Sequence, residues 1–167
     1  MTDIKQKGDT GEAALNQWFK SQQLSYVAIC QAKESFQPLF SNDVKRPDFL
    51  LLFESIGLIA VDAKNYKLNT GKYYTLPIET ELKRSVAFER LFRLPLWYAY
   101  YDNDNSWYWI SALKAVEVGK ERGKGDGRFI AIKRDQFEHI KTADDLAKLY
   151  THRLPSISKI AALPVGL

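Results

Sequence analysis

Residues 46–64 read RPDFLLLFESIGLIAVDAK, two apolar runs with charged residues at their outer ends. The runs 49–53 and 58–61 are almost continuously apolar, which is typical of central strands that are covered on both faces. The four residues between the runs form a link short enough for an antiparallel hairpin. This stretch therefore predicts two neighbouring buried strands whose far ends carry two aspartates and a lysine.

The register of this hairpin decides whether the two aspartates meet. Asp62 and Lys64 share one face of their strand because alternate side chains point the same way, and Ala63 faces away. If the hairpin is centred near Ser55, Asp48 lies opposite Asp62 with Cβ atoms about 5 Å apart. A two-residue loop would pair Asp48 with Ala63 and put it on the wrong face. We therefore predict an odd-length loop or a bulge, in which the glycine of the link could supply a left-handed residue.

The grouping of Asp48, Asp62 and Lys64 suggests a chemistry. Two carboxylates this close resist ionising together unless a cation compensates their charge. Mg²⁺ suits such a site, with Mn²⁺ as a possible substitute, because it binds through one or two carboxylates together with water and phosphate oxygens. Lys64 could orient or help deprotonate a metal-bound water and neutralise charge on a phosphate. The pattern predicts hydrolysis of a phosphodiester, and the alternative interpretation is a solvated ion pair at the strand ends.

The motif Pro47-Asp48 followed by Asp62-Ala63-Lys64 resembles the PD-(D/E)XK nuclease superfamily, which has the restriction-endonuclease-like fold. The resemblance covers roughly residues 10–101. It implies that Asp48 and Asp62 are metal ligands together with the carbonyl of Ala63. It also implies that Lys64 is the catalytic lysine.

Glu12 is a further candidate for this site. It lies in a segment, 10–23, whose apolar stripe of Leu15, Trp18 and Phe19 predicts a helix. In the superfamily an acidic residue on the preceding helix often joins the site, which implies that Glu12 is a catalytic residue and an outer or additional metal ligand. An alternative is that Glu12 belongs to a capping box at the start of this helix, with Asp9 or Thr10 as the cap.

The rest of the chain alternates between strand and helix patterns. Strands are expected at 24–31, 96–101, 107–110 and 128–133, helices at 79–93 and 142–150, and loops at 32–45, 65–77 and 119–127. This order predicts an α/β fold with a central mixed β-sheet flanked by helices. Its core would be a helix, three strands, a helix and a strand, followed by extra C-terminal strands and a helix. We expect one domain over 1–167 and place no element in the tail from Leu154.

Basic and aromatic residues around the predicted site are candidates for contacts with nucleic acid. The net charge of +4 and the pI near 9 favour a polyanionic partner, and we expect DNA before RNA. The candidates are Arg46, Lys67, Lys72, Tyr73, Lys83 and Arg84, with Lys45 and Tyr74 beside them. The alternative for each of them is an ordinary solvated residue of a loop or helix. Other aromatic residues are expected in the core: Trp97, Tyr98, Trp107, Tyr108 and Trp109.

The composition argues against several other classes of protein. Cys30 is the single cysteine, so the chain can form no internal disulfide, and we expect a small buried hydrophobe there. His139 and His152 lie in different segments without the spacing of zinc ligands or of a nucleophilic triad. No apolar run is long enough to span a membrane and no signal peptide is visible, which predicts a cytoplasmic protein.

The function expected from these observations is that of a Mg²⁺-dependent endo- or exonuclease. Two alternatives stay open. One is a non-catalytic module on the same fold that binds nucleic acid or protein. The other is a cleavage subunit that relies on a partner protein for target selection, because so short a chain shows no separate DNA-reading domain. A homodimer is possible, although nothing in the sequence specifies an interface.

Overall fold

A six-stranded mixed sheet forms the centre of the molecule. The computed structural model describes residues 2–32, 43–54, 56–65, 72–102 and 106–151. The strands lie in the order β1 (Tyr26–Ala28), β2 (Phe49–Phe53), β3 (Gly57–Lys64), β5 (Leu96–Tyr101), β6 (Trp107–Ser111) and β9 (Glu138–Ile140). β3 and β5 run parallel, and the other neighbouring strands run antiparallel. The predicted mixed sheet is therefore confirmed.

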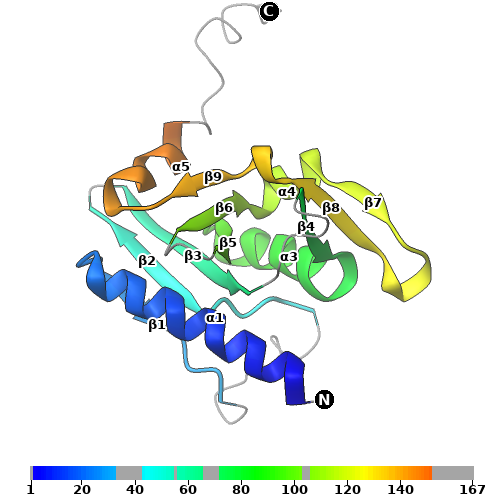
Figure 1. The fold of residues 1–167 in the computed structure, drawn as a ribbon, viewed down its shortest axis with the longest axis horizontal. Helices are drawn as coiled ribbons and strands as arrows, with labels where there is room; N and C mark the ends of the chain where they lie inside the picture. The colour runs from blue at the N-terminus through cyan, green and yellow to red at the C-terminus, as the bar shows by residue number, and fades with distance from the viewer. Residues whose placement is uncertain (1, 33–42, 55, 66–71, 103–105, 152–167) are drawn as a thin grey trace, which may run out of the picture.

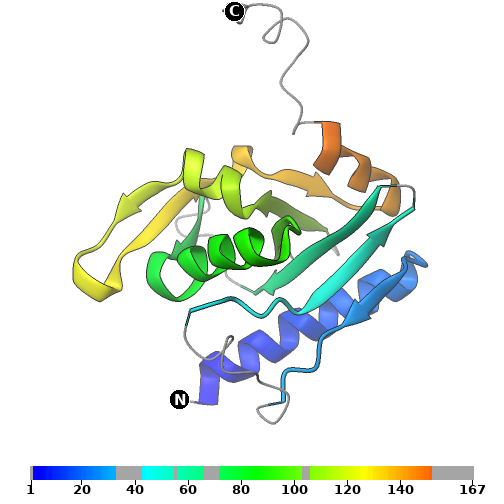
Figure 2. The ribbon, with the colours of Figure 1, turned by 180° about the vertical axis from the view of Figure 1, so that it is seen from behind.

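Both faces of this sheet are covered (Figures 1 and 2). One face carries α1 (Thr2–Ser21) and the C-terminal turns η5 (Ala143–Ala147) and α5 (Lys148–Thr151). The other face carries a π-helical turn, η2 (Ile78–Leu82), the helices α3 (Lys83–Phe92) and α4 (Ala112–Val118), and a second sheet. The second sheet has the order β4 (Tyr73–Pro77), β8 (Phe129–Lys133) and β7 (Lys120–Arg122). Two 3₁₀ turns, η3 (Gly125–Gly127) and η4 (Arg134–Gln136), join these elements.

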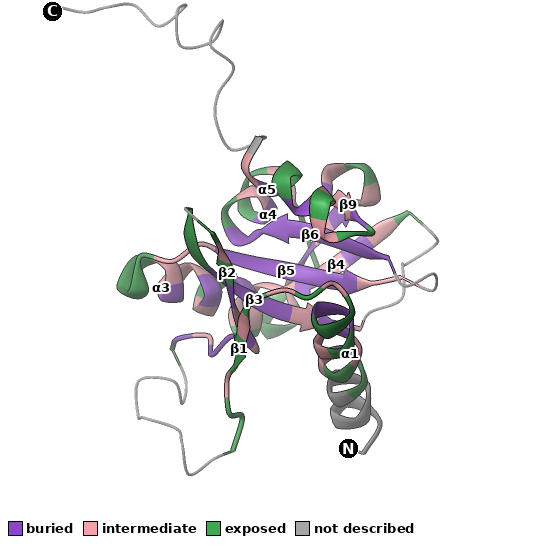
Figure 3. Ribbon diagram, turned by 90° about the vertical axis from the view of Figure 1, so that its left-hand side faces the viewer, coloured by how far each residue is buried: buried purple, intermediate pink, exposed green. Residues whose placement is uncertain are grey.

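Each face has its own apolar cluster, and the central strands between them are buried (Figure 3). Because side chains alternate along β3, Val61 packs toward α1 while Ala60 packs toward α3. The five aromatic residues expected in the core are all buried, as predicted: Trp97, Tyr98, Trp107, Tyr108 and Trp109. Among the described residues, no helix has both the length and the apolar content that crossing a membrane would require.

The helix at the N-terminus begins earlier than predicted. α1 starts at Thr2 and not at Thr10, because its first two turns are polar and carry no apolar stripe that would reveal them in the sequence. Glu12 therefore lies in the interior of a helix. The alternative interpretation of Glu12 as a capping-box residue is wrong.

Several shorter elements also differ from the prediction. Residues 73–77, expected in a loop, form β4, and residues 120–122 of the expected glycine-rich loop form β7. β9 and α4 have no counterpart in the prediction because each is too short to show a clear period. The C-terminal helix is capped as expected by Thr142, which forms a capping box with Asp145. The tail from Leu154 lies outside the described residues.

The hairpin of β2 and β3 has the predicted odd-length connection. Phe53 pairs with Gly57 and Phe49 with Val61, so residues 54–56 link the strands. Gly57 has a φ of +125°, a conformation that favours glycine. Continued by one residue, this register sets Asp48 opposite Asp62.

Candidate active site

Asp62 and Lys64 stand at the end of β3 on the face that α3 covers. Asp62 lies beside Tyr98 of β5, and the Lys64 ammonium lies 5.7 Å from the centre of the Tyr98 ring. Both charged residues are buried, at 1% and 6% exposure. Lys64 Nζ lies 2.5 Å from Asp62 Oδ2, so the two form a close ion pair inside the protein. These residues are thus not the solvated surface pair of the alternative interpretation.

Asp48 is fixed against the same strand end. Its Oδ2 accepts a hydrogen bond from the backbone N–H of Ala63 at 2.8 Å, and its own backbone N–H donates to the carbonyl of Val61 at 3.0 Å. Burial, followed by the nearby negative charge of Asp62, raises the pKa of Asp48 to about 7. The two aspartates are therefore close enough to influence each other, as the hairpin register predicts.

Glu81 enters the site from η2, the turn that precedes α3. Its Oε2 accepts hydrogen bonds from Lys64 Nζ at 2.7 Å and from Lys45 Nζ at 2.9 Å. π-Helical turns are rare and often occur at functional sites. From the sequence, the acids of this segment only indicate the favourable start of a helix, and the π-turn that directs Glu81 inward has no clear signature there.

Lys45 is the second residue of the site that the sequence pattern does not identify. Its Nζ lies 2.9 Å from Asp62 Oδ1, so each carboxylate oxygen of Asp62 contacts an ammonium. The backbone N–H of Lys45 donates to the carbonyl of Arg84 in α3, which holds this segment beside the sheet. We call Lys45, Asp48, Asp62, Lys64 and Glu81 the ionic cluster.

Within the ionic cluster, Asp62, Lys45 and Lys64 hold one another in their ionised forms. Burial opposes the ionisation of Asp62, yet Lys45 and Lys64 outweigh it and lower the pKa of Asp62. Burial likewise disfavours the charged form of Lys64, but Asp62 and Glu81 raise the Lys64 pKa above its ordinary value. The pKa of Lys45 is raised in the same way, against burial and chiefly by Asp62. Both lysines are therefore cations at neutral pH.

Comparisons with known proteins identify the fold. Searches against protein families and against curated proteins give no match for this chain. Among solved structures, Hjc, a Holliday junction resolvase from the hyperthermophilic archaeon Archaeoglobus fulgidus, is similar with a TM-score of 0.51 and 15% identity. The similarity covers 78% of this chain and 91% of the resolvase. The chain has the restriction-endonuclease-like fold.

A second solved structure is a nuclease from a fusselovirus, with a TM-score of 0.42 and 11% identity over 85% of this chain and 88% of that chain. The fold predicted from the resemblance to the PD-(D/E)XK superfamily is thus confirmed by the resolvase. At this level of identity the comparison establishes the fold, and the chemistry must be argued from the side chains.

In the restriction-endonuclease-like fold of this chain, Glu12 lies on α1, which covers the face of the sheet opposite the ionic cluster. Gly11 is packed so tightly that a Cβ there would lie 2.9 Å from Cβ of Asn65, the residue after Lys64. The close approach sets Glu12, which is partly buried, beside the end of β3. Its part in metal binding stays a prediction.

A divalent ion fits the donor chemistry of this site. The described residues contain no group of three or more His, Cys, Asp or Glu side chains placed to hold a metal. The site does offer the two neighbouring carboxylates of Asp48 and Asp62. Burial, followed by the charge of Asp62, raises the pKa of Asp48, and a bound cation would favour the ionised form of this carboxyl group. Mg²⁺ needs no more than one or two carboxylates when water and phosphate complete its shell. The carbonyl of Ala63 is a further oxygen at the same strand end.

The candidates for contact with nucleic acid occupy varied positions. Lys72 and Lys83 are exposed, and Tyr73 and Arg84 are partly buried. Arg46 is almost buried at 9% exposure, and its side chain donates hydrogen bonds to the Gln31 side chain and to the carbonyl of Ala32. Lys67 lies outside the described residues. Tyr74, considered beside Tyr73, is instead a core residue at 1% exposure.

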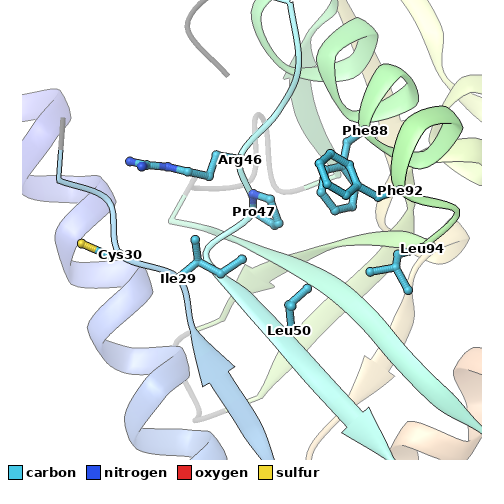
Figure 4. Close-up of a pocket in the computed structure, with 8 residues that line it drawn as sticks. All are labelled: Ile29, Cys30, Arg46, Pro47, Leu50, Phe88, Phe92 and Leu94. Carbon is cyan, nitrogen blue, oxygen red and sulfur yellow. The ribbon is translucent and has the colours of Figure 1, made fainter. Parts of the chain in front are cut away.

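An apolar pocket of about 290 Å³ is lined by Arg46 and Pro47, the two residues that precede Asp48 in the chain (Figure 4). Leu50, Leu94 and the stacked rings of Phe88 and Phe92 form much of its wall. Cys30 lines the pocket as well and is exposed, so the prediction of a buried cysteine is wrong. The reason is that β1 ends at Ala28, two residues before Cys30, so Cys30 leaves the sheet.

Proposed function

We propose that this protein is a metal-dependent nuclease that hydrolyses phosphodiester bonds in DNA. The observation that carries the proposal is the convergence of Asp48, Asp62 and Lys64 at the end of β3, where burial, followed by the charge of Asp62, raises the pKa of Asp48 to about 7. A protein gains nothing in stability from burying acids beside one another, so such a cluster in this fold favours a functional role.

The proposed roles follow from the chemistry of each group. Asp48 and Asp62 would hold Mg²⁺ with the carbonyl of Ala63, and Glu12 would be an additional ligand from α1. The ion would supply an activated water and neutralise charge on the phosphate. Lys64, whose raised pKa keeps it protonated, would act as a fixed positive charge that orients the water and stabilises the developing negative charge. A role as a base that removes a proton is disfavoured by the same pKa.

DNA is the proposed substrate because the chain is basic overall and several candidate contacts lie near the ionic cluster. Lys83 and Arg84 directly follow the turn that carries Glu81, and Arg46 is adjacent to Lys45 in the chain. Lys67, Lys72 and Tyr73 follow β3 in sequence and would extend this surface.

Cleavage assays with matched variants test the proposal. The pure protein is incubated with Mg²⁺ or Mn²⁺ and with linear duplex, single-stranded and four-way junction DNA, and with RNA as a comparison. Asp62→Ala and Lys64→Ala should abolish cleavage, whereas Asp135→Ala and Lys114→Ala, which remove charges elsewhere, should retain it. Circular dichroism establishes that each variant is folded. Cleavage that persists unchanged in both site variants would remove the proposed site.

A non-catalytic binding module is the second candidate function, and one observation favours it. The Asp62 side chain is only 2% exposed, and each of its oxygens contacts a lysine, an arrangement that a purely structural ion cluster would also have. Binding of DNA that needs no metal and survives Asp62→Ala, without cleavage of any substrate, would support this function over the nuclease.

A further inference from the structure

Lys45 forms close ion pairs with two acids of the ionic cluster. Its ammonium sits between two carboxylate oxygens, 2.9 Å from Asp62 Oδ1 and 2.9 Å from Glu81 Oε2. The Lys45 and Glu81 side chains are each 17% exposed, while those of Asp62 and Lys64 are 2% and 7% exposed. Lys45 therefore covers the more accessible side of Asp62, and Lys64 covers the inner side.

We propose that Lys45 holds the cation position in the metal-free protein, and that a divalent ion displaces its ammonium from Asp62 while Glu81 retains it. This inference rests on the proposed function, because it assumes that Asp62 is a metal ligand. Lys45, which lies outside the motif formed by Pro47, Asp48 and residues 62–64, would then set how readily the metal enters the site. Lys45 is on this view a positioning residue that competes with the ion and does not ligate it.

The two contacts of Lys45 make this exchange feasible. A buried ammonium that lost all its partners would strongly destabilise the folded protein. Glu81 Oε2 accepts from both lysines, so Lys45 keeps a carboxylate when it leaves Asp62. Before the ion arrives, the two lysines offset the repulsion among the three acids of the ionic cluster. The metal-free fold is thereby stable without an ion, and the ion must compete with an internal ammonium.

Binding of Mn²⁺, followed by isothermal titration calorimetry, tests the competition. The samples are the wild-type chain, Lys45→Met, Lys114→Met as a lysine control far from the site, and Asp62→Asn. Lys45→Met should bind Mn²⁺ more tightly by about five- to 150-fold, the usual range for coupling between two ligands. Lys114→Met should bind as the wild type does. Unchanged or weaker binding by Lys45→Met would overturn the inference.

A second measurement uses the wild-type chain and separates displacement from a general change in charge. Lysines are lightly acetylated with and without Mn²⁺, and the modified peptides are quantified by mass spectrometry. Lys45 should become more reactive when Mn²⁺ is present, while Lys114 should not change. An unaltered reactivity of Lys45 would contradict displacement, whether or not the methionine variant folds.

The same experiments distinguish this inference from the proposed function. If the wild type binds Mn²⁺ and Asp62→Asn does not, the metal site stands, and a failure of the two Lys45 tests concerns Lys45 alone. If the wild type and Asp62→Asn bind Mn²⁺ equally, the metal site itself is wrong and the role of Lys45 is rejected with it.

Discussion

Two ionic networks that differ in their exposure to solvent include acids two residues apart on η2. The inner network is the set of contacts made by Glu81, and the outer network is formed by Glu79, Lys83, Arg128 and Glu121. Glu81 turns inward and meets Lys45 and Lys64 at 2.9 and 2.7 Å. Glu79 turns outward and meets Lys83 and Arg128, both at 2.6 Å. The distances are alike, but the side chains of the outer network are 32–60% exposed, whereas those that contact Glu81 are at most 17% exposed.

This difference in exposure separates a surface feature from a site. Exposed ion pairs contribute little because water and salt screen them. Buried charges lose their hydration, and replacing them with apolar residues often stabilises a protein. The inner network is therefore the one that needs a functional explanation.

The largest expected effect is on cleavage. Asp62→Asn keeps the size of the side chain but removes the charge that is proposed to bind the metal, so the rate constant for cleavage should fall by at least about 10²–10³-fold, the range for losing one key electrostatic group. Glu79→Gln removes a carboxylate from the outer network and should leave the rate within error of wild type. The measurement is single-turnover cleavage of labelled DNA in Mg²⁺. Equal losses in the two variants would show that burial does not mark the site.

The next largest effect is on stability. Lys64→Met leaves Asp62 and Glu81 with one lysine instead of two, and the uncompensated buried charge should lower the free energy of unfolding by about 3 kcal/mol. Lys83→Met should have the same free energy of unfolding as the wild type within experimental error, because the Lys83 side chain is 60% exposed. Urea denaturation followed by circular dichroism gives both values. A stabilised Lys64→Met variant would mean that the inner network is only a strained ion cluster.

An effect on stability that is smaller per pH unit, but is spread over several pH units, is expected from Asp48. Its pKa is raised from 3.8 in the unfolded chain to about 7 in the metal-free fold. Between pH 3.8 and about 7, the Asp48 carboxyl group therefore binds a proton in the folded state that it has lost in the unfolded chain. The stabilising contribution is complete below pH 4 and is lost as the pH rises toward 7. The slope is at most about 1.4 kcal/mol per pH unit.

The control for Asp48 is Asp48→Asn, which cannot ionise yet can still accept the hydrogen bond from Ala63. The free energy of unfolding of both proteins is measured in the presence of a chelator from pH 4 to 8. The wild type should lose stability relative to Asp48→Asn as the pH rises toward 7, with the slope given above. A constant difference over this range would contradict the raised pKa. Added Mn²⁺ should flatten the difference, because the ion favours the ionised carboxylate.

The comparison of the two networks also shows what the sequence can reveal. The register of the hairpin can be predicted from nearby residues alone. The alternation of side chains along each strand and the length of the link between the strands are sufficient to set Asp48 opposite Asp62. Lys45 and Glu81 could not be found in this way. They meet the end of β3 because the backbone of Lys45 bonds to Arg84 and because η2 turns Glu81 inward, and both depend on long-range packing.

The same reasoning explains the errors in the fold. β2 and β5 were predicted at their observed bounds because they are long apolar runs. β4 was predicted as a loop, although it alternates between partly buried and buried residues, because its partner β8 lies more than fifty residues later in the chain. Within the second sheet, the strand predicted at 128–133 is confirmed by β8, which is an apolar run like β2 and β5. The strands β4 and β7, which pair with β8, were both predicted as loops.

The smallest expected effect concerns binding of DNA by the outer network. Lys83 is exposed and paired with Glu79, so a phosphate can replace its partner without a buried charge being left alone. In an Asp62→Asn background, which is expected to prevent cleavage, Lys83→Met should weaken DNA binding by a few-fold and reduce the slope of log affinity against log salt by about 1. Lys114→Met, which breaks an ion pair between α4 and Glu138 of β9, is the matched control and should leave the slope unchanged. The slope is obtained from fluorescence anisotropy of labelled DNA at several salt concentrations. Equal slopes in the two variants would place Lys83 outside the DNA-binding surface and leave the outer network without a part in recognition.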